Sequence, residues 1–330
     1  MAGEKLFELR RRTFDTPHFR GIEFIEVEAK SIINQVPGSY LPFNWTINPY
    51  RGCSHACSYC FARVTHTYMD LDAGRDFETK IVVKVNAPEL LRRELRAKRW
   101  KGEHVAMGTA TDPYQRAEGR YKIMPRIIRT LAEVGNPFSI LTKGTLILRD
   151  LELLSEAARI TQVSTALSIG TLDDDAWRKS EPGTPHPRKR IEAVAKLNVA
   201  GIACGVMVAP VLPGISDSPK QLREVVIAAL DAGATHVSPI LLHLRPGVKD
   251  VYMTWLEDNY PDLVPRYTDM YKRSAYASAR HKQDLADSID RILRDNGGRR
   301  PRRSPDNAPR WRARRREIAS ITQTEQLKLL

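Results

Sequence analysis

Short apolar runs alternate with amphipathic segments along most of the chain. Apolar runs predict strands over residues 81–85, 105–108, 138–142, 163–169, 202–209 and 236–241. Between them, apolar residues recur at helical spacing over residues 88–100, 125–134, 149–159, 187–200 and 219–232, and Pro88 opens the first of these helices. The alternation predicts consecutive parallel β-α units.

The predicted strands are too apolar to leave a face in water, which indicates a parallel sheet covered by helices. Five or six units favour a full or partial α/β barrel, and an open doubly wound sheet is the alternative. The chain has no repeat at a fixed period, which argues against solenoids and propellers. In either α/β architecture, the ligand lies at the carboxyl ends of the strands.

The pattern divides the chain into four expected segments. Residues 1–40 form an N-terminal extension, residues 41–245 the core, and residues 246–296 a helical C-terminal extension interrupted by Pro261 and Pro265. Residues 297–330 combine Gly, Pro and Arg with few aliphatic residues, so we expect a flexible basic tail.

Composition places the chain among enzyme-sized globular proteins, with 330 residues of which 42% are hydrophobic. Residues 297–330 hold ten Lys or Arg and three Asp or Glu, so they carry +7 of the formal net charge of +13. The tail sequence RWRARRR places Trp311 among arginines, which suits nucleic-acid contact, although a solvated tail is the alternative. No apolar run reaches secretory or membrane-spanning length, so we expect a cytoplasmic protein without membrane contact. We also expect a monomer.

Three of the four cysteines stand together in NPYRGCSHACSYCFAR, residues 48–63. Cys53, Cys57 and Cys60 follow one another as C-x3-C-x2-C, too closely for disulfides without strain, and they indicate metal ligands. Three thiolates on a four-iron cluster leave one iron open for a small chelating molecule. A structural zinc site completed by His55 or His66 is the alternative.

The cysteine spacing, with Tyr59 before the last cysteine, resembles the radical S-adenosylmethionine (SAM) superfamily. The flanking NPYRGC and CFAR, with GTATDPYQRAE, LTKGTLILRDLELL, SEPGTPHPRKRIEAV and MVAPVLPGISD, resemble its branch related to spore photoproduct lyase, over about residues 29–244. The resemblance implies a partial (β/α)6 barrel, a [4Fe-4S] cluster held by the three cysteines, and SAM on the open iron. It also implies reductive cleavage of SAM to a 5'-deoxyadenosyl radical, with an electron donor such as ferredoxin or flavodoxin.

The same resemblance assigns SAM contacts to residues at the strand ends. It assigns Thr109 and Thr111 to the amino group, Lys143 and Arg190 to the carboxylate, Glu181 to the ribose, Ser164 to the ribose or methionine part, and Tyr59 with residues 208–214 to the adenine. Each has a structural alternative. The threonines fit a plain turn, Lys143 a solvated strand end, Tyr59 a core ring, residues 208–214 a rigid loop, and Glu181 with Arg190 an ion pair that stabilises a loop.

Two departures leave the reaction open. Spore photoproduct lyase has a hydrogen-donating cysteine where this chain has Ala110, and Arg116 stands where relatives often have proline. Cys204 is the remaining thiol that could donate hydrogen, although a buried free cysteine usually only packs. We expect hydrogen abstraction from an unidentified substrate, with nucleic acid as the leading candidate. Peptides, metabolites and a non-catalytic zinc-stabilised nucleic-acid-binding protein are the alternatives.

Overall fold

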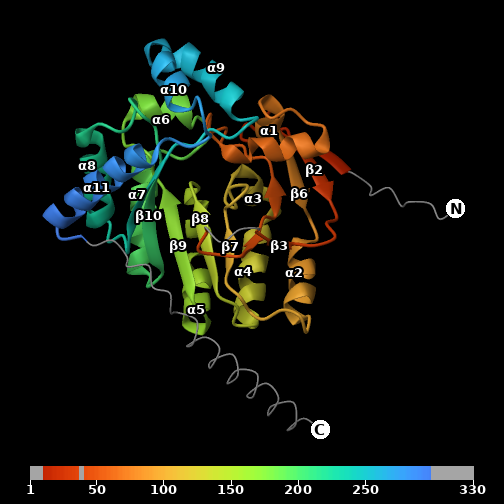
Figure 1. Cartoon of the computed structure of the whole chain (residues 1–330). Coiled ribbons are helices and arrows are strands. Elements are labelled where there is room, and N and C mark those ends of the chain that lie inside the picture. Colours follow the sequence, from red (N-terminus) through yellow and green to blue (C-terminus); the bar gives the residue numbers. More distant parts are fainter. Residues whose placement is uncertain (1–9, 37–40, 299–330) are drawn as a thin grey trace, which may run out of the picture.

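The computed structural model describes residues 10–36 and 41–298, and a curved sheet dominates it (Figure 1). In this described part the sheet has the strand order β11-β10-β9-β8-β7-β4-β3. The strands are β3 (Ile33–Gln35), β4 (Trp45–Ile47), β7 (Val105–Met107), β8 (Phe138–Thr142), β9 (Val163–Ser168), β10 (Ala203–Val211) and β11 (Val237–Leu241). From β4 to β11 every pair is parallel, and β3 closes the edge antiparallel to β4. The order never reverses along the chain, which confirms a partial barrel over a doubly wound sheet.

Amphipathic helices cover the outer face of this sheet. They are α2 (Ala87–Arg96), α4 (Ile123–Glu133), α5 (Leu151–Ile160), α7 (Pro187–Val199), α8 (Pro219–Asp231) and α11 (Ala279–Asp295). In α4 the buried residues include Ile127, Ile128 and Leu131, which lie on one helical face. The first five helices confirm the predicted helical pattern.

One predicted unit was wrong. The run at residues 81–85 was paired with the strand at residues 105–108 as β-α-β, but β6 (Lys80–Lys84) lies in a second sheet. There it pairs with β2 (Glu23–Val27) and β5 (Tyr50–Arg51), and β1 (Arg10–Thr13) forms the outer edge. The parallel neighbours of β7 are instead β4 and β8. A local apolar run shows that a strand is buried, but it does not show in which sheet.

Further helical segments lie at the carboxyl end of the main sheet, and most of them are shorter than the helices that cover its outer face. They are η1 (Phe61–Met69), α1 (Arg75–Thr79), α3 (Arg116–Tyr121), η2 (Thr145–Asp150), α6 (Asp174–Ser180), α9 (Lys249–Asn259), η3 (Pro261–Leu263) and α10 (Val264–Met270). Figure 1 shows α1, α6, α9 and α10 gathered at this one end. The chemistry predicted for the strand ends therefore lies beneath a cover of loops and short helices.

The predicted helical extension divides between two locations. Helix α11 packs on β11 and α8, and its Leu285, Ile289 and Leu293 belong to the main core. Helices α9 and α10 instead belong to a smaller apolar cluster that includes Cys57 and Tyr59. The segment at residues 246–296 thus contributes both to the outer helical layer and to the cover of the strand ends.

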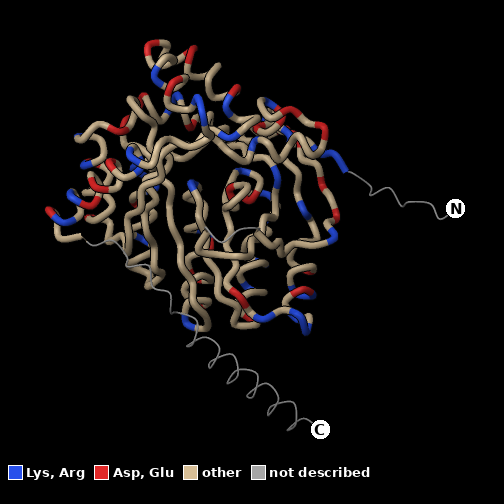
Figure 2. Tube along the Cα trace, viewed as in Figure 1, with Lys and Arg blue, Asp and Glu red and all other residues tan. Residues whose placement is uncertain are grey.

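Charge is mixed over the described residues. Figure 2 shows Lys and Arg interspersed with Asp and Glu over the outer helices. The predicted basic tail falls almost wholly at residues 299–330, outside the described residues, and Trp311 with it. Among the described residues, no helix combines the length and the apolar composition that crossing a bilayer requires.

Candidate functional site

A cavity opens at the carboxyl ends of the strands, where the β-α pattern placed the ligand. Including its open mouth, it has an empty volume of about 890 Å3, which is within the size range of pockets for small molecules and cofactors. The lining comes from the cysteine loop, from the segments after β7 and β8, and from β9, β10 and β11. Its lining residues are Cys53, His55, Cys57, Tyr59, Cys60, Phe61, Ala62, Gly108, Thr109, Ala110, Thr111, Asp112, Leu141, Thr142, Lys143, Ser168, Met207, Ala209, Pro210, Ile240, Leu242 and His243.

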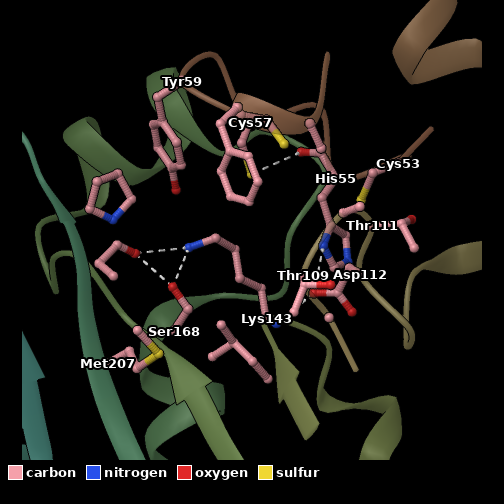
Figure 3. A pocket seen from close by; sticks show the side chains of 18 of the residues that line it. Cys53, His55, Cys57, Tyr59, Thr109, Thr111, Asp112, Lys143, Ser168 and Met207 are labelled. Atoms are coloured by element: carbon pink, nitrogen blue, oxygen red, sulfur yellow. Dashed lines mark hydrogen bonds and ion pairs between the residues drawn. The ribbon is translucent and has the colours of Figure 1, made fainter. Parts of the chain in front are cut away.

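The backbone of the cysteine loop is held from three sides. The amide of Cys53 donates to the carbonyl of Phe77 at 2.9 Å, and the amide of Ser58 donates to the carbonyl of Ser180 at 3.0 Å. The amide of Ser54 donates to the Gln115 side chain at 3.0 Å. Segments distant in sequence therefore fix the loop, and Cys53 and Cys57 lie on its cavity side (Figure 3).

The three thiols fit an iron-sulfur cluster by chemistry and by burial. Burial raises the pKa of Cys53 and of Cys60, and raises the pKa of Cys57 to about 12. Buried thiols of this kind stay protonated until a metal ion stabilises the thiolate. Sulfur ligands in a largely apolar pocket are the set that iron-sulfur clusters use. The residues present therefore fit the group that the sequence predicted.

The geometry does not favour the zinc alternative. The Nδ1 atom of His55 lies 3.4 Å from a carboxylate oxygen of Asp112, and the Nε2 atom of His66 lies 2.9 Å from the carbonyl oxygen of Lys80. Within residues 10–36 and 41–298, no three His, Cys, Asp or Glu side chains are placed to hold one metal ion. A cluster of four irons differs in this respect, because each thiolate binds a different iron.

Lys143 is the centre of a buried polar network on the other side of the cavity (Figure 3). Its Nζ donates to the hydroxyl of Ser168 at 2.8 Å, to a carboxylate oxygen of Glu181 at 3.0 Å and to the carbonyl of Ala209 at 3.2 Å. The hydroxyl of Tyr59 donates to the same Glu181 oxygen. Lys143 thus lines the cavity with its three N–H groups already hydrogen-bonded, rather than as the solvated lysine of the alternative.

Arg190 neutralises the other oxygen of Glu181. The guanidinium is fully buried, donates to Glu181, and also donates to the carbonyl of Ser168 at 2.8 Å and to the hydroxyl of Thr184 at 2.7 Å. Burial alone would raise the pKa of Glu181, but Arg190 and Lys143 outweigh burial and lower it to about 2. Neither Glu181 nor Arg190 lines the cavity, so the geometry favours the ion pair over direct SAM contact for both.

Thr109 and Thr111 both line the cavity after β7, as predicted for a strand end. The hydroxyl of Thr111 donates to the carbonyl of Gly52 at 2.7 Å, next to Cys53. The hydroxyl of Thr109 is 3.4 Å from the Asn48 side chain, which also accepts from the amide of Ala110 at 3.1 Å. Asn48, in the NPYRGC motif, therefore shapes this loop.

Asp112 joins the cysteine loop to the end of β8, a role that sequence reasoning missed. Its carboxylate accepts from the hydroxyl of Thr142 at 2.6 Å and from the amide of Lys143 at 2.7 Å, and it faces His55. Burial would raise the pKa of Asp112, but His55 and these hydrogen bonds lower it below its ordinary value. The Asp112-Pro113 pair is an ordinary turn signal in sequence, and only the fold shows what the carboxylate contacts.

The structure separates two other predicted residues from the cavity. Ser164 lies at the start of β9, whereas Ser168, on the same face four residues later, lines the cavity at the strand end. The alternation was therefore sufficient to select the face, and the strand-end rule would have selected Ser168. Cys204 is fully buried in the main core and does not line the cavity, which favours packing over hydrogen donation. In the predicted adenine segment, Ala209 and Pro210 line the cavity.

Comparison with known proteins agrees with this geometry. The sequence model of the Radical SAM superfamily matches residues 47–226. An uncharacterized protein of Mycobacterium tuberculosis (strain ATCC 25618 / H37Rv) is 48% identical over 283 residues, which are 86% of this chain and 83% of that protein.

Solved structures of spore photoproduct lyase share the fold. The complex with dinucleoside spore photoproduct has a TM-score of 0.62 at 16% identity, covering 86% of this chain and 83% of the lyase. A double mutant with bound AdoMet and the same dinucleoside has a TM-score of 0.60 at 15% identity, covering 87% and 85%. The chain therefore belongs to the radical SAM superfamily, and it is an enzyme whose cofactors are SAM and, by family, a [4Fe-4S] cluster.

Proposed function

We propose that Cys53, Cys57 and Cys60 hold the [4Fe-4S] cluster and that the Lys143 side of the cavity holds SAM. The observation that carries the proposal is that the three thiols and the Lys143 network line opposite sides of one cavity at the strand ends. When bound, the reduced cluster and SAM supply a 5'-deoxyadenosyl radical that abstracts hydrogen from the substrate. The work of the chain is to place these groups and to exclude water.

On the SAM side, the residues that reach the cavity divide into polar and apolar groups. Lys143, Ser168 and Thr109 form the polar edge beside the methionine part, and a SAM carboxylate would replace one of the hydrogen bonds that Lys143 makes within the chain. Ala209 and Pro210 offer an apolar edge to the adenine. Glu181 and Arg190 act from outside the cavity. They hold Lys143 and Tyr59 in position, and the Glu181 carboxylate keeps the ammonium charge compensated before SAM binds.

In this proposal, no cysteine of the site donates a hydrogen atom to the substrate radical. Ala110 lines the cavity where spore photoproduct lyase has its hydrogen-donating cysteine. Among the described residues, the thiols that line the cavity are Cys53, Cys57 and Cys60, which the cluster occupies. We therefore infer that the substrate radical is quenched by a donor other than a cysteine of this site, so the reaction differs from repair of the spore photoproduct.

We propose nucleic acid as the substrate. The excess positive charge of residues 297–330 suits phosphate contacts, and the fold is that of a lyase solved with a dinucleoside ligand. We further infer a cytoplasmic monomer that receives electrons from a ferredoxin or flavodoxin. Free buried cysteines and a one-electron requirement support a reducing compartment.

Anaerobic reconstitution of two cysteine variants with iron and sulfide tests the cluster assignment. Cys57→Ala should lose the brown absorbance, hold well under the roughly four irons of a complete cluster, and form no 5'-deoxyadenosine from SAM after reduction. The matched control, Cys204→Ala, should keep both the iron and the SAM cleavage, because Cys204 lies in the main core. Equal iron in the two variants would remove Cys57 from the ligand set.

A further inference from the structure

An exposed row of three aromatic rings begins at the cavity and continues outward. Phe61 and His243 both line the cavity, and their ring centroids are 5.7 Å apart. His243 stacks on Tyr276 with centroids 5.4 Å apart and planes 28° apart. Phe61 is 39% exposed and Tyr276 is 45% exposed, so the rings at both ends of the row present surface to solvent. Large exposed rings in contact at a cavity mouth indicate a binding surface.

The row is built from three separate segments. Phe61 follows the last cluster cysteine directly, His243 follows β11, and Tyr276 lies before α11. The backbone of His243 pairs with the backbone of Tyr276 in an isolated antiparallel bridge, which fixes the stacked pair. Because Phe61 adjoins Cys60, the inner end of the row lies beside the proposed cluster.

Two cations flank the rings. The guanidinium carbon of Arg245 lies 5.6 Å from the Phe61 ring centroid, and an Arg245 N–H group donates to the Tyr276 hydroxyl at 3.2 Å. The Nζ of Lys282 lies 5.6 Å from the Tyr276 ring centroid. Burial and Arg245 lower the pKa of His243, so this ring is neutral at pH 7 and adds no third charge. Cations held over the faces of partly exposed rings suit a nucleotide, because the ring can stack on the base while the cation contacts the phosphate.

We propose that Phe61, His243 and Tyr276 form a stacking platform for an unpaired nucleotide, with Arg245 and Lys282 contacting its phosphates. This inference rests on the proposed nucleic-acid substrate and narrows it to single-stranded or flipped bases. A base within a duplex is already stacked on both faces, so it has no free face for these rings. A nucleotide stacked on the platform brings its neighbour to the cavity opening, next to the proposed cluster.

Binding of a fluorescein-labelled twelve-residue oligothymidylate to the full-length protein without cofactors tests the platform by anisotropy. Tyr276→Ala should weaken binding by roughly 5- to 150-fold, the loss expected for one stacking ring. The same strand annealed to its complement should bind more weakly than the single strand. Tyr68→Ala is the matched control, because Tyr68 is 77% exposed and lies on η1 outside the platform, and it should leave binding unchanged. Unfolding midpoints of both variants check the fold.

A salt titration separates the platform from the basic tail. Arg245→Gln should lower the slope of log affinity against log salt by about 0.7, the value for one phosphate contact on a single strand. Equal losses in Tyr276→Ala and Tyr68→Ala, or tighter binding of the duplex, would overturn the platform. So would preferential binding of an acidic tyrosine-containing peptide through the same residues. A wild type that forms 5'-deoxyadenosine but binds no single strand would refute the platform and leave the cluster assignment standing.

Discussion

The substitution Glu181→Gln tests the network that holds Lys143 in place. The Glu181 side chain is only 5% exposed, and it compensates Arg190, which is fully buried, and Lys143, which is 13% exposed. The substitution keeps the size of the side chain but removes its charge. Removing one member of a buried ion pair typically costs about 3–5 kcal/mol, because the remaining charges stay buried without compensation.

The lowered pKa of Glu181, caused by the same Arg190 and Lys143 charges, points in the same direction. Glu181 titrates at about 2 in the folded protein against an ordinary value of 4.5, a difference worth roughly 3 kcal/mol. Because the folded pKa is the lower one, this stability is present above about pH 4.5 and is lost as the pH falls toward 2.

The assay is urea unfolding of the protein without cofactors, at pH 7 and at two lower pH values. Glu181→Gln should lower the free energy of unfolding by about 3 kcal/mol at pH 7 and should flatten its dependence on pH below 4.5. The matched control is Glu192→Gln, which removes a pair with Lys189 on the surface of α7, where both side chains are more than half exposed. It should cost at most about 1 kcal/mol. Similar losses in the two variants would refute the argument that the Glu181 charges are buried and coupled.

Two further substitutions test packing around the site and around α11. Gly183→Ala should lower iron uptake on reconstitution, because the new Cβ would lie 2.2 Å from the Ser54 carbonyl oxygen in the cysteine loop, whereas Gly119→Ala, with 3.9 Å to its nearest neighbour, should not. The iron content after reconstitution is measured for both variants. Full iron uptake by Gly183→Ala would contradict the close contact between residue 183 and the cysteine loop. Ile289→Ala should destabilise the protein by about 2–5 kcal/mol by creating a core cavity, and Ile160→Ala, at a site 38% exposed, by clearly less. Thermal or urea unfolding measures the loss of stability in each variant. Equal losses in Ile289→Ala and Ile160→Ala would mean that α11 is not part of the core.

The hydrophobic pattern was sufficient for the fold class and for most helices. Parallel strands without a solvent-exposed face must be covered on both sides. The alternation of apolar strands with amphipathic helices over residues 105–232 is therefore compatible with few architectures. The pattern failed at β6, because burial is a local property and sheet membership depends on which partner is available. The N-terminal strand β2 supplied that partner.

The sequence signal for the site was strongest where chemistry is concentrated in one short motif. The spacing of Cys53, Cys57 and Cys60 is local, so the sequence alone could indicate metal ligation and the family. Ser168, and not the predicted Ser164, lines the cavity. Both lie on the same face of β9, so the rule that ligands lie at strand ends would have selected Ser168.

Only the tertiary structure determined how distant residues combine. The carboxylate of Glu181 meets Lys143, Tyr59 and Arg190 from three other segments, and this arrangement leaves Lys143 at the cavity while Arg190 is buried behind it. The row of Phe61, His243 and Tyr276 likewise joins segments more than two hundred residues apart in the chain. A sequence states which groups are present and which face of a strand or helix they occupy. Charge compensation and ring stacking depend on distances across the fold, and only folding determines those distances.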